Sequence, residues 1–376
     1  MIPFNKPYLT GKEAHYMYDA VYTGKLSGNG KYTKKCQQFF ESRYGIKKCL
    51  LTTSCTDALE MAAILADIQP GDEVIMPSYT FVSTSNAFVL RGAYIRFADS
   101  RQDHPGIDED SIENLITDKT KAIVPVHYAG VACDMEKIMT IAAKHNLLVV
   151  EDAAQAIDSY FTFSDGTQKA LGSIGHLAAF SFHETKNIIS GEGGLLAIND
   201  DRFSQRAEII WEKGTNRSAF FRGEVDKYGW VDIGSSFLPS ETIAAFLWAQ
   251  LENLGDIQDR RKQHWDTYRN GLNHWAKENN VRLPEIPQFA TNNAHMFYLV
   301  CESIEQRSEI IEKLKSNDIS AVFHYLSLHK SPFYQEKHDG RTLSLSDFYS
   351  ECLVRLPMYY ELTDDNIEFI IANIIN

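Results

Sequence analysis

The chain has 376 residues, of which 44% are hydrophobic and 23% charged, and its formal net charge is -13 at pH 7. The acidic charge argues against nucleic-acid binding, and no apolar run is long enough to span a membrane. The six cysteines form no C-x-x-C pair, and the N-terminus lacks the apolar core of a signal peptide. We therefore expect a cytoplasmic protein with reduced thiols and without a zinc site.

In the first two-thirds of the chain, short β-rich runs alternate with amphipathic segments. Several runs are almost continuously apolar, which is typical of strands covered on both faces. We predict seven strands, at Lys48–Thr53, Glu73–Pro77, Tyr94–Ala98, Ala122–His127, Leu147–Asp152, Ala178–Phe182 and Gly194–Ile198. We predict helices at Asp57–Ala66, Asp110–Thr117 and Asp134–His145. This alternation predicts an α/β fold with a mostly parallel sheet flanked by helices, in which ligands bind at the carboxyl ends of the strands.

Two local signals refine this picture of the first part of the chain. Asp110 and Glu113 have the spacing of a helix capping box. The irregular stretch Phe161–Gln168 contains Ser164–Thr167, which is typical of a hairpin tip.

The pattern changes after about Gln250, so we expect a large domain over residues 1–250 and a smaller α+β domain over residues 251–376. Two closing helices end the chain. The other elements expected in the smaller domain are one or two long polar helices in Leu251–Asn279, a strand at Met296–Cys301, a helix at Glu305–Ser316 and a strand at Ser320–Tyr325.

An acidic residue ends one predicted strand, and a serine and a lysine follow another. Asp152 would be buried by its apolar strand unless it has a partner, either a protonated pyridine nitrogen or a structural salt bridge. Lys186 follows the apolar run that contains Ser181, and its alternative is a solvated surface lysine. Together these residues match a pyridoxal phosphate site, in which the lysine forms a Schiff base, the acid holds the ring nitrogen and the serine binds phosphate.

Three further segments follow predicted strands. Ser54-Cys55-Thr56 opens a helix, which predicts a phosphate seat or simply an N-cap. Phe81 could stack on a cofactor ring or pack between sheet and helix. Gln155 could reach the phenolic oxygen of the ring or order its own loop.

The order of these segments resembles the DegT/DnrJ/EryC1/StrS family of sugar-nucleotide aminotransferases, which have the type I pyridoxal phosphate fold. The resemblance covers essentially the whole chain. The matching stretches are Gly71–Phe81, His127–Gly130, Glu151–Gln155, Phe180–Lys186 and Gly191–Gly194.

The resemblance implies a role for each position. Lys186 would be the catalytic residue, holding the cofactor and then moving the proton. Asp152 would pair with the pyridine nitrogen and Gln155 would contact the ring oxygen. Members of this family are homodimers with their active sites at the subunit interface. The remaining cofactor contacts implied are the phosphate ligands Cys55, Thr56 and Ser181 and the stacking residue Phe81.

The chain also departs from the common family pattern. Many members carry Gly-x-Asn-Tyr-Arg, whose Asn reaches the phosphate in the other subunit, and the corresponding stretch here is Gly234–Leu238. Ser236 takes the place of that Asn but is shorter. The chain is similar to the dTDP-4-amino-4,6-dideoxygalactose transaminases of enterobacterial common antigen synthesis. The stretches that carry this similarity are Lys213–Arg217, Phe220–Gly223, Ile68–Gly92 and His295–Tyr298.

The resemblance implies transfer of the amino group of L-glutamate to the C4 keto group of dTDP-4-dehydro-6-deoxy-D-glucose, giving dTDP-4-amino-4,6-dideoxy-D-galactose. Arg217 and Arg222 are candidates for the diphosphate, with surface solvation as the alternative. His324, Tyr325 and His329 are candidates for the sugar, and His329 ranks first because it resembles a family position that lines the sugar site. The run Lys25–Gly28 is a candidate for the mouth of the site.

Other functions stay open from the sequence. The enzyme could aminate C3, give a gluco product or use a UDP-sugar. A pyridoxal-phosphate-dependent sugar dehydratase or deaminase is a second alternative, although Lys186 argues against the relatives that lack this lysine. A non-enzymatic scaffold is disfavoured by the intact set of Asp152, Gln155, Ser181 and Lys186.

Overall fold

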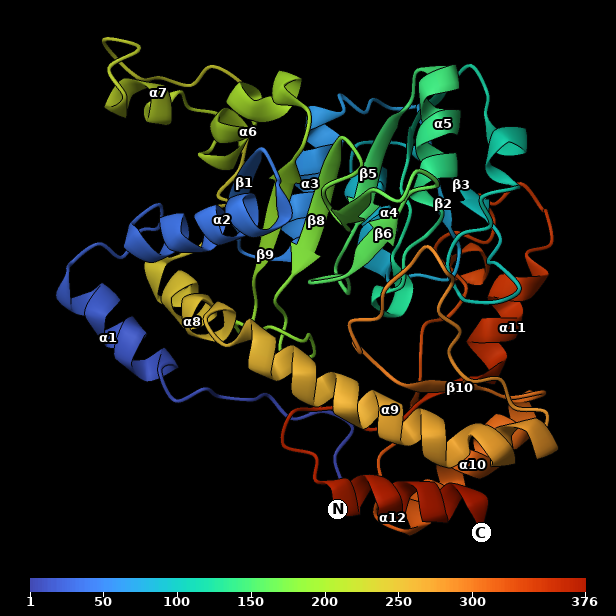
Figure 1. Ribbon diagram of the computed structural model, residues 1–376. Coiled ribbons are helices and arrows are strands. Elements are labelled where there is room, and N and C mark those ends of the chain that lie inside the picture. The colour runs from blue at the N-terminus through green and yellow to red at the C-terminus, as the bar shows by residue number, and fades with distance from the viewer.

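The computed structural model describes residues 1–376 and has a seven-stranded sheet at its centre (Figure 1). The strand order is β1-β9-β8-β5-β4-β2-β3. Only β9 runs antiparallel to its neighbours, so the prediction of a mostly parallel sheet is confirmed. The strands are β1 (Lys48–Thr52), β2 (Glu73–Pro77), β3 (Tyr94–Ala98), β4 (Thr120–Ile123), β5 (Leu148–Asp152), β8 (Leu177–Ser181) and β9 (Gly194–Ile198).

Strand β4 differs most from its predicted range, Ala122–His127. It begins two residues earlier and ends at Ile123. Pro125 has no N–H with which to continue the ladder, and only an isolated bridge between Val126 and Asp152 follows. The other six strands lie within one residue of their predicted bounds.

Helices cover both faces of the sheet, because alternate side chains of each strand enter two separate hydrophobic cores (Figure 1). In β8, Phe180 joins the core with α2, α5 and α8, whereas Ala179 joins the core with α3, α4 and α6. The helices of this part are α1 (Glu13–Tyr22), α2 (Lys31–Tyr44), α3 (Cys55–Leu65), α4 (Val82–Val89), α5 (Met135–His145), α6 (Ser204–Trp211), α7 (Arg217–Phe221) and α8 (Glu241–Leu251).

The predicted helix at Asp110–Thr117 is wrong, since only a short 3-10 turn forms at Ile112–Leu115. The capping box is wrong too. Asp110 pairs with Lys137, and Glu113 pairs with Lys144 and with His145, whose Nε2 lies 2.8 Å away. These acids therefore bind the neighbouring helix α5 instead of their own backbone. The predicted hairpin is confirmed, with strands β6 (Tyr160–Thr162) and β7 (Gln168–Ala170).

The C-terminal part begins with α9 (Leu254–Glu278), a single helix of 25 residues. It packs with a three-stranded antiparallel sheet in the order β10-β12-β11. Strand β12 was not predicted from the sequence. Residues of this part form a third core, and we retain the two-domain division as a proposal. Its remaining elements are β10 (Tyr298–Val300), α10 (Ile304–Ser316), β11 (Val322–Phe323), α11 (Ser344–Cys352), β12 (Leu353–Arg355) and α12 (Asp364–Ile375).

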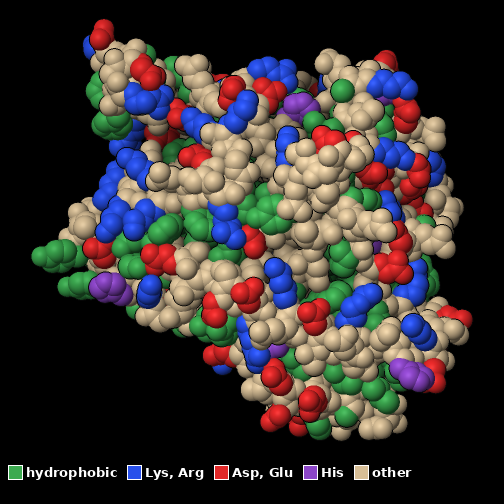
Figure 2. All heavy atoms as spheres, in the orientation of Figure 1, with side chains coloured by type: hydrophobic (Ala, Val, Ile, Leu, Met, Phe, Trp, Pro, Cys, Tyr) green, Lys and Arg blue, Asp and Glu red, His purple; other side chains and the backbone are tan.

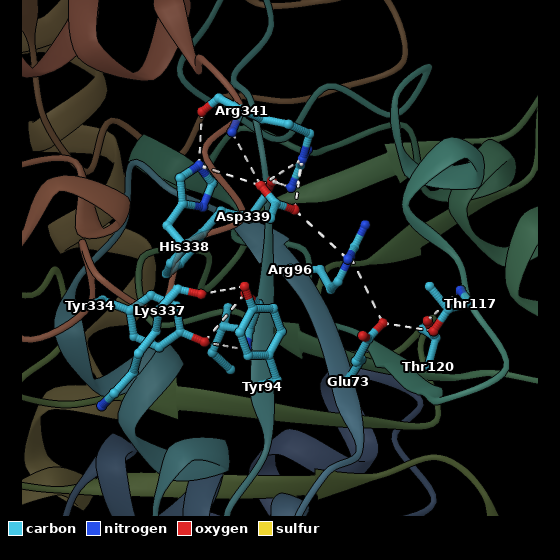
Figure 3. Close-up of polar contacts among 12 residues, drawn as sticks. Glu73, Tyr94, Arg96, Thr117, Thr120, Tyr334, Lys337, His338, Asp339 and Arg341 are labelled. Atoms are coloured by element: carbon cyan, nitrogen blue, oxygen red, sulfur yellow. Dashed lines mark hydrogen bonds and ion pairs between the residues drawn. The ribbon is translucent and has the colours of Figure 1, made fainter.

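The C-terminal part also covers the edge of the large sheet. Residues 334–341 run along the edge strand β3 (Figure 3). The Tyr334 hydroxyl donates to the Ile95 carbonyl at 3.3 Å, and Arg341 donates to the Phe97 carbonyl at 2.9 Å. Arg96 of β3 lies 3.8 Å from both Glu73 and Asp339. This segment therefore occupies backbone groups that an open edge would leave for other chains. None of the helices is both long and apolar enough to cross a lipid bilayer.

Candidate active site

A cavity of about 490 Å³ lies at the carboxyl ends of the parallel strands, where the two parts of the chain meet. A groove of about 600 Å³ beside Arg43, Lys47 and His176 lies near the amino end of β8, and none of the candidate residues lines it. The smaller cavity is therefore the candidate active site. It gathers the candidate cofactor residues Cys55, Thr56, Phe81, Asp152, Gln155, Ser181 and Lys186.

The N-terminus of α3 forms one wall of this cavity. Ser54 is the N-cap, and its hydroxyl accepts from the Asp57 N–H at 3.0 Å. The N–H groups of Cys55 and Thr56 have no acceptor within the protein, as expected in a first helical turn. The Thr56 hydroxyl donates to Ser83 at 2.8 Å. Ser54 thus caps the helix, and the N–H groups of the next two residues remain available as hydrogen-bond donors to an anion.

Burial raises the pKa of the Cys55 thiol well above its usual range, so this residue contributes no negative charge to the wall. Ser181 ends β8 and lies half-buried on the same side of the cavity. Gly194 of β9 lets α3 approach the sheet, since a Cβ there would lie 2.4 Å from the backbone of Ser54 and Cys55.

Asp152 is 5% exposed at the end of β5 and forms no ion pair with a lysine or an arginine. Its Oδ2 accepts from the Thr84 hydroxyl at 2.7 Å, and its Oδ1 accepts from the Ala154 N–H at 3.1 Å. The structural salt bridge considered from the sequence is therefore absent. Two neutral donors orient the carboxylate and leave its charge free for a cationic ligand group.

Lys186 lies in a tight loop after β8, in which Glu184 N–H donates to Gly191 and the Lys186 N–H donates to His183, both at 2.9 Å. Its side chain is half-buried, lines the cavity and forms no ion pair. Burial lowers the pKa of the Lys186 amine, while Cys55 and Asp152 act in the opposite direction. A larger fraction of this amine is therefore uncharged and nucleophilic at neutral pH than for a surface lysine.

Gln155 connects the two parts of the chain. Its Oε1 accepts from the Ala129 N–H at 2.6 Å, and its Nε2 donates to the Tyr325 hydroxyl at 3.0 Å. The ring of Tyr325 also stacks on His324, with centroids 3.5 Å apart. His324 lies within 2.6 Å of the Tyr128 hydroxyl through Nδ1. Both His324 and Tyr325 line the cavity, at the place expected for residues that close over a substrate.

The structure corrects the expectation for His329. Its Nδ1 lies 2.7 Å from the Ser78 hydroxyl and its Nε2 lies 3.6 Å from Asp347. The side chain is 5% exposed and does not line the cavity. Because both ring nitrogens face protein groups, His329 joins α11 to the loop after β2 and has no nitrogen to offer a sugar.

The other candidate substrate residues lie outside the cavity of their own chain. Arg222 pairs with Glu208 at 2.9 Å and Glu224 at 2.7 Å. Arg217 is exposed, and its guanidinium lies 5.2 Å from the ring of Phe221. Ser236 is exposed on the loop before α8. This loop also packs on the predicted mouth segment Lys25–Gly28, since a Cβ at Gly28 would lie 2.2 Å from the Pro239 carbonyl oxygen.

Several cavity residues were missed from the sequence. Thr84 supports Asp152 from α4, and His295 and Arg355 reach the cavity from the C-terminal part. Thr84 lies three residues after the candidate Phe81, so a polar residue near the end of β2 was the signal that could have found it. Arg355 carries no such signal, because the three-residue strand β12 that holds it is too short to be recognised by periodicity.

The donor set of the cavity fits pyridoxal phosphate. The free N–H groups at the start of α3 and the hydroxyls of Thr56 and Ser181 suit a phosphate. The Asp152 carboxylate, which has no cationic partner, suits a protonated ring nitrogen. The Lys186 amine, whose pKa is lowered by burial, suits an aldehyde. Phe81 is 54% exposed at the N-terminus of α4 and offers a ring to the same space.

Comparisons with known proteins agree with this chemistry. The model of the DegT/DnrJ/EryC1/StrS aminotransferase family matches residues 7–375. The spore coat polysaccharide biosynthesis protein SpsC of Bacillus subtilis is 30% identical over 384 residues, covering 98% of this chain and 95% of SpsC. An aminotransferase from Psychrobacter cryohalolentis superimposes with a TM-score of 0.91 at 26% identity, over 99% of this chain and 98% of that one.

The fold is also that of Streptococcus pneumoniae Spr1654, which has been assigned as a sugar aminotransferase and solved in PLP and PMP forms. The PMP form has a TM-score of 0.90 at 24% identity and covers 100% of this chain and 98% of that one. The chain therefore belongs to the DegT/DnrJ/EryC1/StrS aminotransferase family, and the donor set of its cavity fits the cofactor pyridoxal phosphate.

Proposed function

We propose that this enzyme transfers the amino group of L-glutamate to the C4 keto group of dTDP-4-dehydro-6-deoxy-D-glucose and releases dTDP-4-amino-4,6-dideoxy-D-galactose. The observation that supports amino transfer is the placement of Lys186 and an acid without a cationic partner, Asp152, in one cavity. The choice of sugar rests on the similarity of Lys213–Arg217 and Phe220–Gly223 to the transaminases of enterobacterial common antigen synthesis.

Pyridoxal phosphate supplies the electron sink that stabilises negative charge on the carbon that loses a proton. Lys186 removes this proton from the α-carbon of the donor and later delivers one to C4 of the sugar. Its Nζ must be uncharged to accept a proton, and the burial that lowers its pKa favours this form. Asp152, held by Thr84 and Ala154, keeps the ring nitrogen protonated.

The remaining roles are proposals of the same kind. The N–H groups and hydroxyl at the start of α3, together with Ser181, bind the cofactor phosphate. Phe81 covers one face of the ring. Gln155 contacts the ring oxygen through its side-chain amide. Because Oε1 already accepts from the Ala129 N–H and Nε2 already donates to the Tyr325 hydroxyl, Nε2 would donate to the ring oxygen with its second hydrogen.

We further propose that the enzyme is a homodimer with both sites at the interface. Arg217, Arg222 and Ser236 lie away from the cavity of their own chain and would serve the cavity of a second copy. Apolar side chains project from the same region, including Tyr22, which is 80% exposed on α1, and Trp230, which is 85% exposed. Figure 2 shows apolar side chains standing out at this end of the molecule. Exposed aromatic groups of this kind mark an association surface.

The proposed function is tested with purified enzyme, L-glutamate and a panel of dTDP- and UDP-linked 3-keto and 4-keto sugars. We expect 2-oxoglutarate and the amino sugar to form in equal amounts, most rapidly with dTDP-4-dehydro-6-deoxy-D-glucose. NMR of the product distinguishes a galacto from a gluco configuration at C4. Sugar turnover without 2-oxoglutarate would instead indicate a dehydratase or a deaminase.

A further inference from the structure

His295 brings an imidazole from the C-terminal part of the chain into the cavity that holds Lys186. The side chain is 7% exposed, and its Nδ1 lies 2.8 Å from Oδ1 of Asn187, the residue that follows Lys186. Its Nε2 has no hydrogen-bonding partner within the protein and is not enclosed by protein atoms. One ring nitrogen is therefore held by the loop of Lys186, and the other faces the cavity.

The contacts of Asn187 determine which ring nitrogen of His295 carries the proton. The Asn187 Nδ2 donates to the backbone carbonyl of Asn293 at 2.9 Å and to Oε1 of Gln258 at 2.7 Å. A backbone carbonyl can only accept, so the amide nitrogen must point towards it and the amide oxygen must point towards the imidazole. Because this oxygen can only accept as well, the proton of the neutral ring lies on Nδ1.

The Nε2 atom of His295 is therefore a hydrogen-bond acceptor. Burial lowers the pKa of His295 well below its usual range, so the ring is neutral at pH 7 and Nε2 carries only a lone pair. The other imidazole that lines the cavity lacks this constraint. His324 Nδ1 lies 2.6 Å from the Tyr128 hydroxyl, which can either donate or accept, so its tautomer is not fixed by this contact.

Few groups in the proposed reaction have a hydrogen to donate to this acceptor. The cofactor ring nitrogen donates to Asp152, the carboxylates of L-glutamate only accept, and its amine is the group that is transferred. The keto sugar has free hydroxyls at C2 and C3, whereas the donors of its nucleoside lie beyond the diphosphate. C3 is bonded to C4, which Lys186 must reach, and His295 is hydrogen-bonded to the residue after Lys186. The C3 hydroxyl is therefore the donor that fits.

We propose that His295 Nε2 accepts a hydrogen bond from the hydroxyl on the carbon next to the keto carbon, which is C3 in a 4-keto sugar. The inference rests on the proposed function, in that a keto sugar accepts the amino group. His295 is then a specificity residue, because a carbonyl oxygen at C3 would turn its own lone pairs towards that of Nε2. Asn187 is a positioning residue that holds the tautomer on which this selection depends.

The test follows the reaction of the aminated holoenzyme with a keto sugar by the absorbance of the bound cofactor. The wild-type enzyme is given dTDP-4-dehydro-6-deoxy-D-glucose, its 3-deoxy analogue and its 2-deoxy analogue. The 3-deoxy analogue should react with an apparent second-order rate constant about 10- to 100-fold lower, because it leaves Nε2 without a donor. The 2-deoxy analogue should react nearly as fast as the parent sugar.

His295→Phe should react more slowly with the parent sugar by a similar factor and should no longer distinguish it from the 3-deoxy analogue. His295→Gln should recover part of the loss, because an amide oxygen can take the place of Nε2. His264→Phe is the matched control. His264 is another buried histidine, with Nε2 3.3 Å from the Tyr360 carbonyl, but it does not line the cavity. This variant should keep the preference for the 3-hydroxyl.

The inference is overturned if the wild-type enzyme uses the 3-deoxy analogue as well as the parent sugar, a result that needs no variant to fold. A preference that persists in His295→Phe, or an equal loss in its half-reaction with L-glutamate, would also overturn it. A requirement for the C2 hydroxyl instead would refute the assignment to C3. If the enzyme aminates a different keto sugar, the proposed choice of sugar is wrong. The analogue of that sugar without the hydroxyl beside its keto group then tests His295 in the same way.

Discussion

Replacing Gly194 by Ala tests whether the start of α3 is the phosphate seat. The added Cβ would lie 2.4 Å from Cys55 N and from the carbonyl atoms of Ser54, whereas ordinary contact begins at 3.4 Å. All three are backbone atoms, so β9 and the N-terminus of α3 must separate by about 1 Å.

Such a shift carries the Cys55 and Thr56 N–H groups out of hydrogen-bonding range of a phosphate that stays on Ser181. Each hydrogen bond to a charged group contributes about 1.5–3 kcal/mol, so losing one of them weakens cofactor binding by about 10- to 150-fold. The assay is titration of the apoprotein with pyridoxal phosphate, followed by absorbance, with thermal unfolding measured alongside.

Gly193→Ala provides a matched control at the neighbouring residue. Its Cβ would lie 2.3 Å from the Ser190 hydroxyl, which can rotate away, and not from backbone. We expect near-normal cofactor affinity for this variant. If Gly194→Ala bound the cofactor as tightly as the wild type while remaining folded, the assignment of the phosphate to the start of α3 would be refuted.

Three further predictions concern single residues. Asp152→Asn should bind the cofactor but reduce the rate of the donor half-reaction about 100-fold or more in stopped-flow measurements, and an unchanged rate would remove its proposed role. Lys186→Met should abolish turnover. Because burial lowers the pKa of Lys186 in the folded apoprotein, the folded state binds fewer protons than the unfolded state, so Lys186→Met should be more stable than wild type at pH 7. This difference in stability between the variant and the wild type should shrink as the pH rises towards 10.5, and denaturant unfolding at several pH values measures it. A difference that stayed constant over this range would contradict the reasoning. His329→Phe should lower stability by about 1–3 kcal/mol, because the buried Ser78 hydroxyl loses its hydrogen bond to the imidazole and keeps only the one from the N–H of residue 329. The KM for the sugar nucleotide should change little, and a large KM effect would return His329 to the sugar site.

The sheet and the cofactor residues could be predicted because both depend on local patterns. Strands β2, β3 and β9 were predicted to the residue, and polar residues follow the apolar runs directly. Parallel strands bring their carboxyl ends to one edge, so Asp152 and Lys186 had to lie near each other once the strands were known. Where a proline interrupts the pattern, as in β4, the predicted end of the strand was wrong.

Local patterns in the sequence were enough to predict the fold class, the cofactor chemistry and nine residues of the cavity. Seven of these residues follow strands of the large sheet, and His324 and Tyr325 lie at the end of a predicted strand of the C-terminal part. Other residues reach the cavity, or leave it, only through the packing of distant parts of the chain. Arg355 and His295 enter the cavity, and His329 leaves it for Ser78 and Asp347, through the packing of the C-terminal sheet on the large one. Such contacts join residues up to 251 positions apart, and neither periodicity nor motif spacing carries information over that separation.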